Sequence, residues 1–303
     1  MKRNIQVRSL VINSLCMIVI ILGINVTAAY CQDSAQAPVI RKAGFVKNTF
    51  ESNWLMDNQT VMVPVKGTLE MDIQHRFGTV DKGKEDVWGI FAPSNIRLGL
   101  SYSPVNRLNV GAGLTKERTQ IDINAKYALL RQTTNNNVPV SVTYYGNVVI
   151  DARDKSNFRE SYHRISYFHQ LLIARKITDR FSVQVSPGLS WFNNVEGYVD
   201  SKGEIQGKMK NHHLAISALG RYKITDRSSI ILGYDQPLTQ HATNNPQPNI
   251  CFGFETTTSS HAFQVFAGNY YSIVPQSNNM FNQNDYREGQ FLIGFNITRL
   301  WSF

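Results

Sequence analysis

The 303-residue chain has few cysteines, little charge and no long apolar run after its amino-terminal segment. Its three cysteines exclude a disulfide framework, and no Cys-x-x-Cys or haem-attachment spacing occurs. Charged residues make up 17% of the chain, below the roughly 25% of a typical soluble protein. The absence of a later run of about 18 apolar residues argues against a membrane-spanning helix. Basic residues are scattered, so a nucleic-acid partner is not expected.

The first 31 residues follow the order of a secretory signal peptide. A basic start precedes the apolar run Leu15 to Ile24, and small residues come next. This order predicts a signal peptide over residues 1–31, cleaved somewhere between positions 28 and 31. Cys31 is alternatively a lipidation site, but the bulky Tyr30 stands where a lipoprotein signal has a small residue.

Residues 32–66 do not alternate cleanly between apolar and polar side chains. The polar stretch Gln32 to Pro38 leads into Arg41 to Lys66, which mixes aromatic, asparagine and charged residues. This part either packs inside or beneath the following domain, or adds an edge strand at Val61 to Val65. We expect a periplasmic leader, a pre-barrel segment with a short helix.

From Gly67 onward, apolar and polar residues alternate with the period of two that is typical of β-strands. We expect twelve strands, most of them near the roughly 9–11 residues that a tilted membrane-spanning strand needs. The expected strands are Gly67–Gly78, Asn95–Ser103, Leu108–Thr115, Gln120–Leu130, Pro139–Ile150, Tyr162–Lys176, Arg180–Phe192, His212–Lys223, Ser228–Gln236, Asn249–Glu255, His261–Tyr270 and Gln290–Trp301. Such a pattern predicts an all-β domain over residues 67–303.

Short and long connections between these strands alternate, with Thr115 to Thr119 as a short exception among the long ones. The short ones carry turn-forming residues, and two of them, Lys176–Arg180 and Lys223–Arg227, have the same sequence, with Ser103–Arg107 similar to both. This order predicts an up-and-down antiparallel transmembrane β-barrel with both termini on one side. We expect short periplasmic turns and longer extracellular loops. A soluble β-sandwich or jelly roll is the alternative, but it does not require this regular alternation.

The last strand, Gln290 to Phe303, has one apolar and one small, polar face and ends on an aromatic residue. It resembles the closing strand of a bacterial outer-membrane β-barrel, and we expect it to pair with Gly67–Gly78. Arg299 lies on the apolar face, where we expect its long side chain to reach the periplasmic membrane interface.

Three stretches carry a resemblance to a known family: Gly67–Gly78, Trp88–Tyr102 and Lys126–Gln132. They are similar to a family of outer-membrane β-barrels from Bacteroidota, domain of unknown function 5777, over about Phe45 to Phe303. The resemblance implies a barrel in the cell outer membrane. It brings no catalytic or binding residue with it.

Charged residues recur on the polar faces of the expected strands. Because charges are costly against hydrocarbon, we expect them to line the barrel interior. The predicted lumen-lining residues are Glu70, Asp72, Arg76, Arg97, Asp122, Lys126, Arg221, Asp235 and Glu255, with Arg164 pointing the same way. They indicate either a selective pore or solute site, or ion pairs that fill a small barrel. The near balance of their charges favours the second interpretation.

No catalytic, cofactor or metal residue is assigned, since the seven histidines show no compact ligand spacing. Ser259 and His261 suit a barrel-embedded lipid hydrolase, but no acid partner is evident. We expect a monomeric conduit for small solutes or a membrane scaffold. A barrel partner of a periplasmic or electron-transfer protein is the alternative. Expected partners are outer-membrane lipid, the barrel assembly machinery and a possible periplasmic protein.

Overall fold

The computed structural model describes residues 44–303. The predicted signal peptide, its cleavage region and Cys31 lie outside this range. Within it, no helix is both long enough and apolar enough to cross a membrane.

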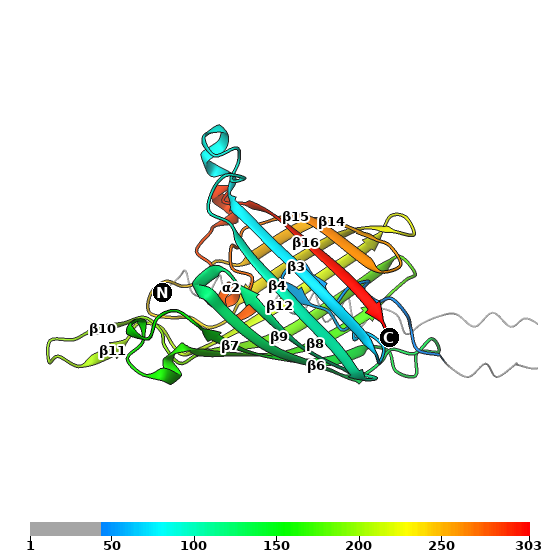
Figure 1. Ribbon diagram of the computed structural model, residues 1–303, viewed down its shortest axis with the longest axis horizontal. Coiled ribbons are helices and arrows are strands. Elements are labelled where there is room, and N and C mark those ends of the chain that lie inside the picture. The colour runs from blue at the N-terminus through cyan, green and yellow to red at the C-terminus, as the bar shows by residue number, and fades with distance from the viewer. Residues whose placement is uncertain (1–43) are drawn as a thin grey trace, which may run out of the picture. The chain divides into compact units, whose positions relative to one another are not determined.

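Twelve antiparallel strands close into one barrel (Figure 1). Each strand pairs with its neighbours in chain order, and β16 closes the ring by pairing with β3. The strands are β3 (Thr68–Thr79), β4 (Asn95–Val105), β5 (Leu108–Thr115), β6 (Gln120–Leu130), β7 (Ser141–Asp151), β8 (Ile165–Lys176), β9 (Phe181–Phe192), β12 (His212–Lys223), β13 (Ser228–Pro237), β14 (Asn249–Thr257), β15 (His261–Gly268) and β16 (Leu292–Ser302). The predicted fold class is confirmed, and the expected strand ends lie within three residues of the observed ones.

The seam between the first and last strands lies where the sequence predicts it. β16 pairs with β3 from Leu292 opposite Thr79 to Ser302 opposite Thr68, with one irregularity near Leu292. Beyond the seam, the Phe303 amide donates to the Gly67 carbonyl oxygen, at 3.1 Å. Gly67 has a φ of +82°, which favours glycine. The final aromatic residue is therefore joined to the start of the barrel by a backbone hydrogen bond.

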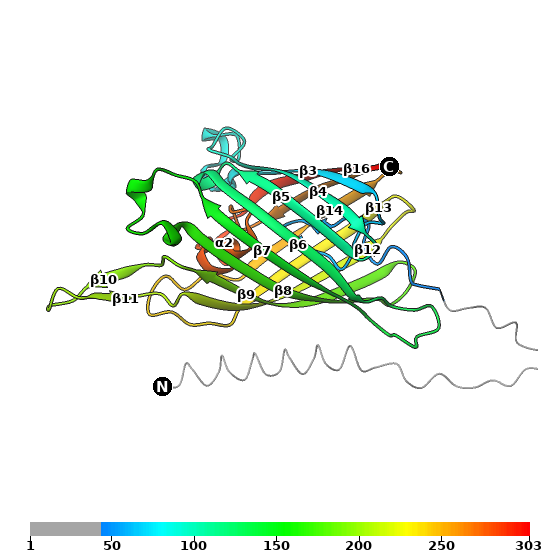
Figure 2. The ribbon, with the colours of Figure 1, turned by 60° about the horizontal axis from the view of Figure 1, so that its bottom comes forward.

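The barrel is apolar outside and polar inside, the reverse of a soluble domain. Leu114 and Ile123 on the outer face are each 59% exposed, whereas Arg76 on the inner face is fully buried. Figure 2 shows the tilted strands β6 to β9 that form one side of this wall. Arg299 is exposed on the outer face, with its guanidinium 4.8 Å from the Trp301 ring centroid.

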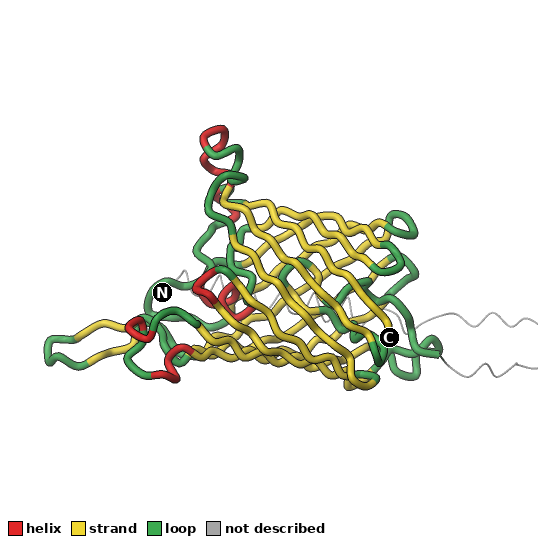
Figure 3. The backbone as a smooth tube through the Cα atoms, viewed as in Figure 1, coloured by secondary structure: helices red, strands yellow, loops and turns green. Residues whose placement is uncertain are grey.

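The two ends of the barrel differ in the length of their connections. The turn end carries short turns and the carboxy terminus, and the loop end carries long connections that hold most of the helical turns (Figure 3). The elements of the loop end are η1 (Val80–Glu85), η2 (Glu117–Thr119), η3 (Lys155–Asn157), η4 (Ser161–Arg164), β10 (Gly197–Val199), β11 (Ile205–Gly207), α2 (Pro275–Phe281) and η5 (Tyr286–Glu288). The predicted alternation of connections is present apart from a short link over 116–119 at the loop end and a longer one over 131–140 at the turn end. Which end faces the periplasm stays a prediction.

Residues 44–66 form one unit with the barrel, and the stretch 49–61 packs inside it. They contain a small hairpin of β1 (Trp54–Leu55) and β2 (Asn58–Gln59). The expectation of a short helix was wrong. The side chains of Asn53, Asn58 and Gln59 form hydrogen bonds with the barrel wall, and these bonds hold the stretch in a non-helical conformation. Val61 to Val65 form no edge strand. We call residues 44–66 the plug segment.

Candidate functional site: the plugged lumen

The plug segment enters and leaves the lumen at the turn end. Near its start, the Val46 amide donates to the Gln132 carbonyl oxygen at 2.8 Å. Near its exit, the Gly67 amide donates to the Ser103 carbonyl oxygen at 2.8 Å. Its tip lies deep in the lumen, where Met56 takes a left-handed φ of 59°. The plug segment is therefore a loop whose two ends lie on the same side of the barrel.

One side of the lumen is charged. We define the charged wall as Glu70, Asp72, Arg97, Asp122 and Lys126, which lie on β3, β4 and β6 and are all buried. Arg97 lies between two carboxylates, at 2.6 Å from Asp72 and 2.8 Å from Asp122. Its guanidinium also lies 5.2 Å from the Trp54 ring of the plug segment. Each charge on this wall thus has a polar or aromatic partner, as burial of charge requires.

Two glycines make room for this ion-pair cluster. A Cβ at Gly113 would contact the Arg97 guanidinium, and one at Gly99 would contact the Asp72 carboxylate. Both glycines lie on inner-face positions of neighbouring strands. The Arg97 and Asp72 side chains occupy the space that a larger residue at either glycine position would need.

Lys126 bonds to the plug segment rather than to a carboxylate. Its Nζ donates to Asn53 Oδ1 and Gln59 Oε1, both at 2.9 Å, and to the Thr60 carbonyl oxygen at 3.3 Å. Asn53 in turn donates to Glu70 Oε2 at 2.8 Å. An amide of the plug segment therefore bridges the buried lysine and the buried glutamate.

A second ion-pair cluster lies on the opposite side of the turn end. Arg221 is 2.9 Å from Glu51 of the plug segment and 3.1 Å from Glu255. Glu255 Oε1 also accepts hydrogen bonds from Ser52 and from Gln264, each at 2.9 Å. The plug segment thus contributes a carboxylate and a hydroxyl to this cluster.

Two charged residues deeper in the lumen rely on amides and an aromatic ring. Arg76 donates to Asn296 at 3.0 Å and lies 4.6 Å from the Phe266 ring centroid. Asp235 accepts from Asn58 and from Asn249, each at 3.1 Å. All nine predicted lumen-lining residues are buried and face inward. Arg164 instead lies in η4 at the loop end, where it donates to the Arg153 carbonyl oxygen.

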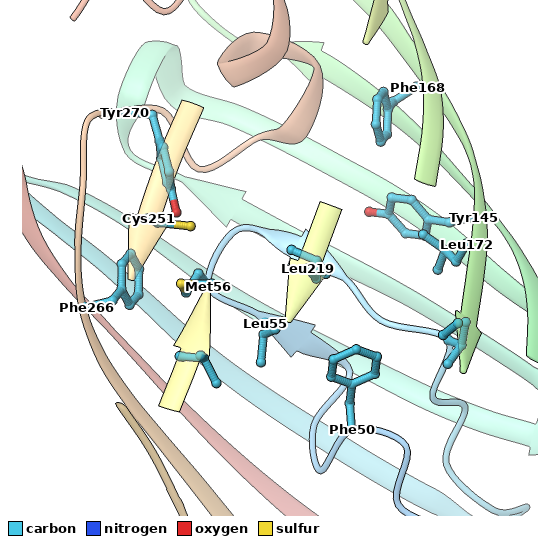
Figure 4. Packing of buried hydrophobic residues seen from close by; sticks show 13 residues of the cluster. Phe50, Leu55, Met56, Tyr145, Phe168, Leu172, Leu219, Cys251, Phe266 and Tyr270 are labelled. Atoms are coloured by element: carbon cyan, nitrogen blue, oxygen red, sulfur yellow. The ribbon is translucent and has the colours of Figure 1, made fainter. Parts of the chain in front are cut away.

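On the remaining side of the lumen, apolar inward residues are mixed with polar ones such as Gln170, Asp235 and Gln264. We define the apolar wall as Phe168, Leu172, Leu219, Ile231 and Phe266, which lie on β8, β12, β13 and β15. The plug segment covers it with four apolar side chains (Figure 4). These are Phe50, Leu55, Met56 and Val61. Burial of apolar surface therefore stabilises the plug segment on this side, in addition to hydrogen bonds such as those from the Met56 amide to Gln264 and from the Val61 amide to Gln184.

The apolar wall is a feature that the alternation pattern does not show. β8 and β13 carry the runs Leu171–Ile173 and Ile230–Leu232, which are apolar on both faces. An inner face of this kind has to be covered by something other than water. Lost alternation in these two strands is the sequence signal that could have placed the plug segment inside the barrel.

The loop end is closed by the connection between β15 and β16. Its helix α2 is buried from Pro275 to Met280. Asn278 Nδ2 donates to Asp57 Oδ2 at the tip of the plug segment, at 3.0 Å. Asn282 donates to Asn249 at 2.8 Å. The connection is rich in asparagine and glutamine, and these uncharged amides meet the lumen from the side opposite to the plug segment.

Two histidines form a buried pair at the loop end that sequence spacing did not reveal. The Lys210 amide donates to His241 Nδ1, and His241 Nε2 lies 3.0 Å from His213 Nδ1. Because His241 Nδ1 accepts a hydrogen bond, its proton is on Nε2 and points to His213. The residues lie 28 positions apart. Among residues 44–303, no group of three or more histidine, cysteine, aspartate or glutamate residues is arranged to hold a metal ion.

The geometry does not assemble the predicted Ser259 and His261 pair. His261 Nδ1 lies 3.1 Å from Ser260 Oγ and 3.5 Å from Thr258 Oγ1. Ser259 is exposed at the tip of the turn. Within the described range, His261 forms no salt bridge with an acidic residue.

The sequence from residue 50 to residue 301 matches a family model described as a membrane bound beta barrel domain, DUF5777. The chain belongs to this family. The match confirms the family that the three motifs indicated, and with it a membrane-bound β-barrel. No curated protein sequence matches the chain.

Solved structures of porins and channels are similar to this chain at low sequence identity. The NanC porin is 9% identical with a TM-score of 0.46, covering 78% of this chain and 99% of that chain. An outer membrane channel from Pseudomonas putida F1 is 12% identical with a TM-score of 0.48, covering 79% and 97%. The KdgM porin is 11% identical with a TM-score of 0.44, covering 77% and 99%. These likenesses concern the fold alone.

Proposed function

We propose that the protein is an outer-membrane conduit for small solutes, closed at rest by its own plug segment. The observation that carries this proposal is the path of residues 44–66. Both ends of this loop lie at the turn end, so it can withdraw through that end without being threaded through the barrel. The same proposal includes an origin in Bacteroidota, a turn end that faces the periplasm, and a monomeric state.

The contacts of the plug segment support a closed resting state that can open. On the charged wall, Asn53 and Gln59 bind Lys126 and Glu70 through hydrogen bonds that water can replace. On the apolar wall, withdrawal exposes apolar surface, which favours the closed state by about 25 cal/mol for each Å². After the plug segment has withdrawn, the charged wall is polar enough for water to hydrate it. A conduit of this design conducts only after the plug segment has been displaced.

A membrane scaffold is the second candidate. It is favoured by the closure of the lumen from both ends, since the plug tip bonds directly to α2 through Asp57 and Asn278. A sheath for an electron-transfer protein has no room in a lumen filled in this way. A lipid hydrolase gains no support from the geometry at His261.

Planar-bilayer conductance distinguishes the conduit from the scaffold. The wild-type protein should stay closed, whereas the variant N53A/N58A/Q59A should show stepwise openings, because it lacks the amides that bind the plug segment to the wall. A Met56→Cys substitution supplies a lock. Met56 and the buried Cys251 both border the space next to Gly233, so a short crosslinker with a thiol-reactive methanethiosulfonate group at each end can join the two cysteines, releasing a sulfinate from each.

The locked form of the opened variant should be silent, and a reducible crosslinker should restore its openings after reduction. Folding of each variant is checked on a gel, where the unheated, folded protein migrates differently from the heated, unfolded protein. Conductance that persists in the locked form would show that the plug segment is not the gate. Silence of the folded N53A/N58A/Q59A variant would reject the conduit and leave the scaffold.

A further inference from the structure

Six arginines encircle the turn end of the barrel. They are Arg107, Arg131, Arg175, Arg180, Arg227 and Arg299, and we call them the arginine ring. They lie beside β4–β5, β6–β7, β8–β9, β12–β13 and β16 in the closed strand order. The ring therefore follows the perimeter of the barrel rather than marking one patch on it.

The arginine ring has no internal counter-charge. None of its six side chains lies within 4.0 Å of a carboxylate in residues 44–303. Two loop-end arginines do have carboxylate partners, Arg153 with Asp151 and Arg287 with Asp285. Within the described residues, the six arginines of the ring are thus free to meet an external anion.

The repeated turn sequence positions part of this ring. Thr178 Oγ1 accepts the amides of Arg180 and Phe181, at 3.3 and 3.0 Å. Thr225 Oγ1 accepts the amides of Arg227 and Ser228 at the same two distances. The Thr-Asp-Arg turn therefore places an arginine in the same way at two separate points of the perimeter. Arg107 ends the related turn between β4 and β5.

Two arginines of the ring lie close enough to affect each other. Partial burial and then the nearby Arg107 guanidinium lower the pKa of Arg131. Both residues flank one groove, whose apolar lining includes Pro64, Val65 and Leu130. Both side chains are exposed, and the Arg131 guanidinium lies 4.2 Å from the Phe45 ring centroid. Together they give the groove a positively charged rim that favours an anion.

We propose that the arginine ring binds the anionic headgroups of phospholipids in the leaflet at the turn end, with the Arg107–Arg131 groove as one defined headgroup site. Arginine suits this partner because its planar guanidinium donates several hydrogen bonds to phosphate oxygens. The outer face beside the ring is apolar and aromatic, with Tyr102, Tyr127 and Trp301 at this end of their strands. Such residues are typical of the membrane interface.

The perimeter distribution favours lipid over an acidic protein. A docked protein covers one side of a barrel end, whereas lipid headgroups surround all of it. The ring also continues onto the outer wall at Arg175 and Arg299, which lie on strands rather than in turns. This inference needs only the membrane-bound barrel, and it holds whether or not the lumen conducts.

Native mass spectrometry of the purified full protein in neutral detergent tests the proposal. Phosphatidylglycerol and phosphatidylcholine with the same acyl chains are added in equal amounts. The wild-type protein should retain phosphatidylglycerol over phosphatidylcholine by a factor on the order of five or more. The ring variant R107Q/R131Q/R180Q/R227Q should approach equal retention. Added inorganic phosphate should not remove the preference, because the acyl chains contribute to binding.

The matched control is R118Q/R153Q/R159Q/R287Q, which removes four arginines from the loop end. It should keep the wild-type preference, and both variants must show the folded species on an unheated gel. Equal retention of the two lipids by the wild-type protein would overturn the proposal. So would equal loss of preference in the two variants, or complete displacement of the lipid by inorganic phosphate. A wild-type protein that captures an acidic polypeptide but shows no lipid preference would assign the ring to a protein partner.

Discussion

The charged wall and the apolar wall of the lumen face the same plug segment but stabilise it through different interactions. The charged wall offers buried ion pairs such as Arg97 with Asp72 and Asp122, and it accepts amides from the plug segment. The apolar wall offers side chains such as Leu172 and Ile231, and it is covered by Phe50 and its neighbours. The comparison teaches that hydrogen bonds fix the plug segment on both sides of the lumen, and that the apolar wall adds the burial of apolar surface to them.

Loss of the central charge on the charged wall should have the largest effect. Arg97→Met leaves Asp72 and Asp122 buried without their cation, which should lower the free energy of unfolding by about 3–5 kcal/mol. Urea unfolding in lipid vesicles, followed on unheated gels, measures this change. Arg159→Met in an exposed loop is the control, expected to change stability by less than about 0.5 kcal/mol. Equal effects of the two substitutions would mean that the lumen is hydrated at Arg97.

The apolar wall is tested by two adjacent leucines on opposite faces of β8. Leu172 is fully buried against the plug segment, and Leu171 is 36% exposed on the outer face. Leu172→Ala should cost about 3 kcal/mol, because it leaves a cavity in a packed region. Leu171→Ala should cost clearly less in the same urea titration. In a water-filled lumen the order would reverse, since an inward leucine would then gain nothing from burial.

A smaller effect is expected from filling the space beside the ion pairs. Gly113→Ala places a Cβ against the Arg97 guanidinium and should cost about 1–3 kcal/mol. Gly220→Ala is the matched control, because its Cβ would meet only the Leu232 Cβ at 4.0 Å. Both are strand glycines, so the difference between their urea midpoints reports the contact with Arg97. Identical midpoints would contradict the tight packing of the charged wall.

The histidine pair at the loop end should give the smallest effect. Burial, then the charges of Lys210 and His212, lower the pKa of His241 below its ordinary value near 6.5. A lowered folded-state pKa means that the stabilising contribution is complete above the unfolded pKa and is lost as the pH falls below about 6.5. Wild-type stability should therefore fall by about 1 kcal/mol more than that of His241→Gln between pH 7.5 and pH 5. Parallel pH profiles of the two proteins would remove His241 from this role.

The same contrast explains what the sequence could predict. On the charged wall, alternation in β3, β4 and β6 assigns residues such as Asp72 and Asp122 to the inner face, where the structure places them. On the apolar wall, runs such as Ile230–Leu232 carry no alternation, so their inward side chains and their cover were not predictable. The sequence of the plug segment has no regular period. Its residues contact one wall of the lumen or the other, and they do not lie on the two faces of a sheet.

Contacts between distant residues were also beyond pattern reasoning. Asn278 meets Asp57 across 221 positions, and Ser52 meets Glu255 across 203. From the sequence alone, Asn278 and Ser52 cannot be told apart from asparagine and serine residues in exposed loops. Only the closure of the barrel brings them together, and so the filling of the lumen follows from topology rather than from local composition.

The central claim is that residues 50–61 fill the lumen of the folded barrel, and Cys251 reports on it directly. This free thiol is 3% exposed and packs in the same cluster as Met56 and Tyr270. The measurement is its rate of reaction with a small, charged maleimide in the folded, vesicle-embedded protein, read by peptide mass spectrometry. We predict negligible labelling of the wild-type protein and rapid labelling of the folded N53A/N58A/Q59A variant. Labelling of wild-type Cys251 at the rate of a free thiol in water would contradict the plugged lumen.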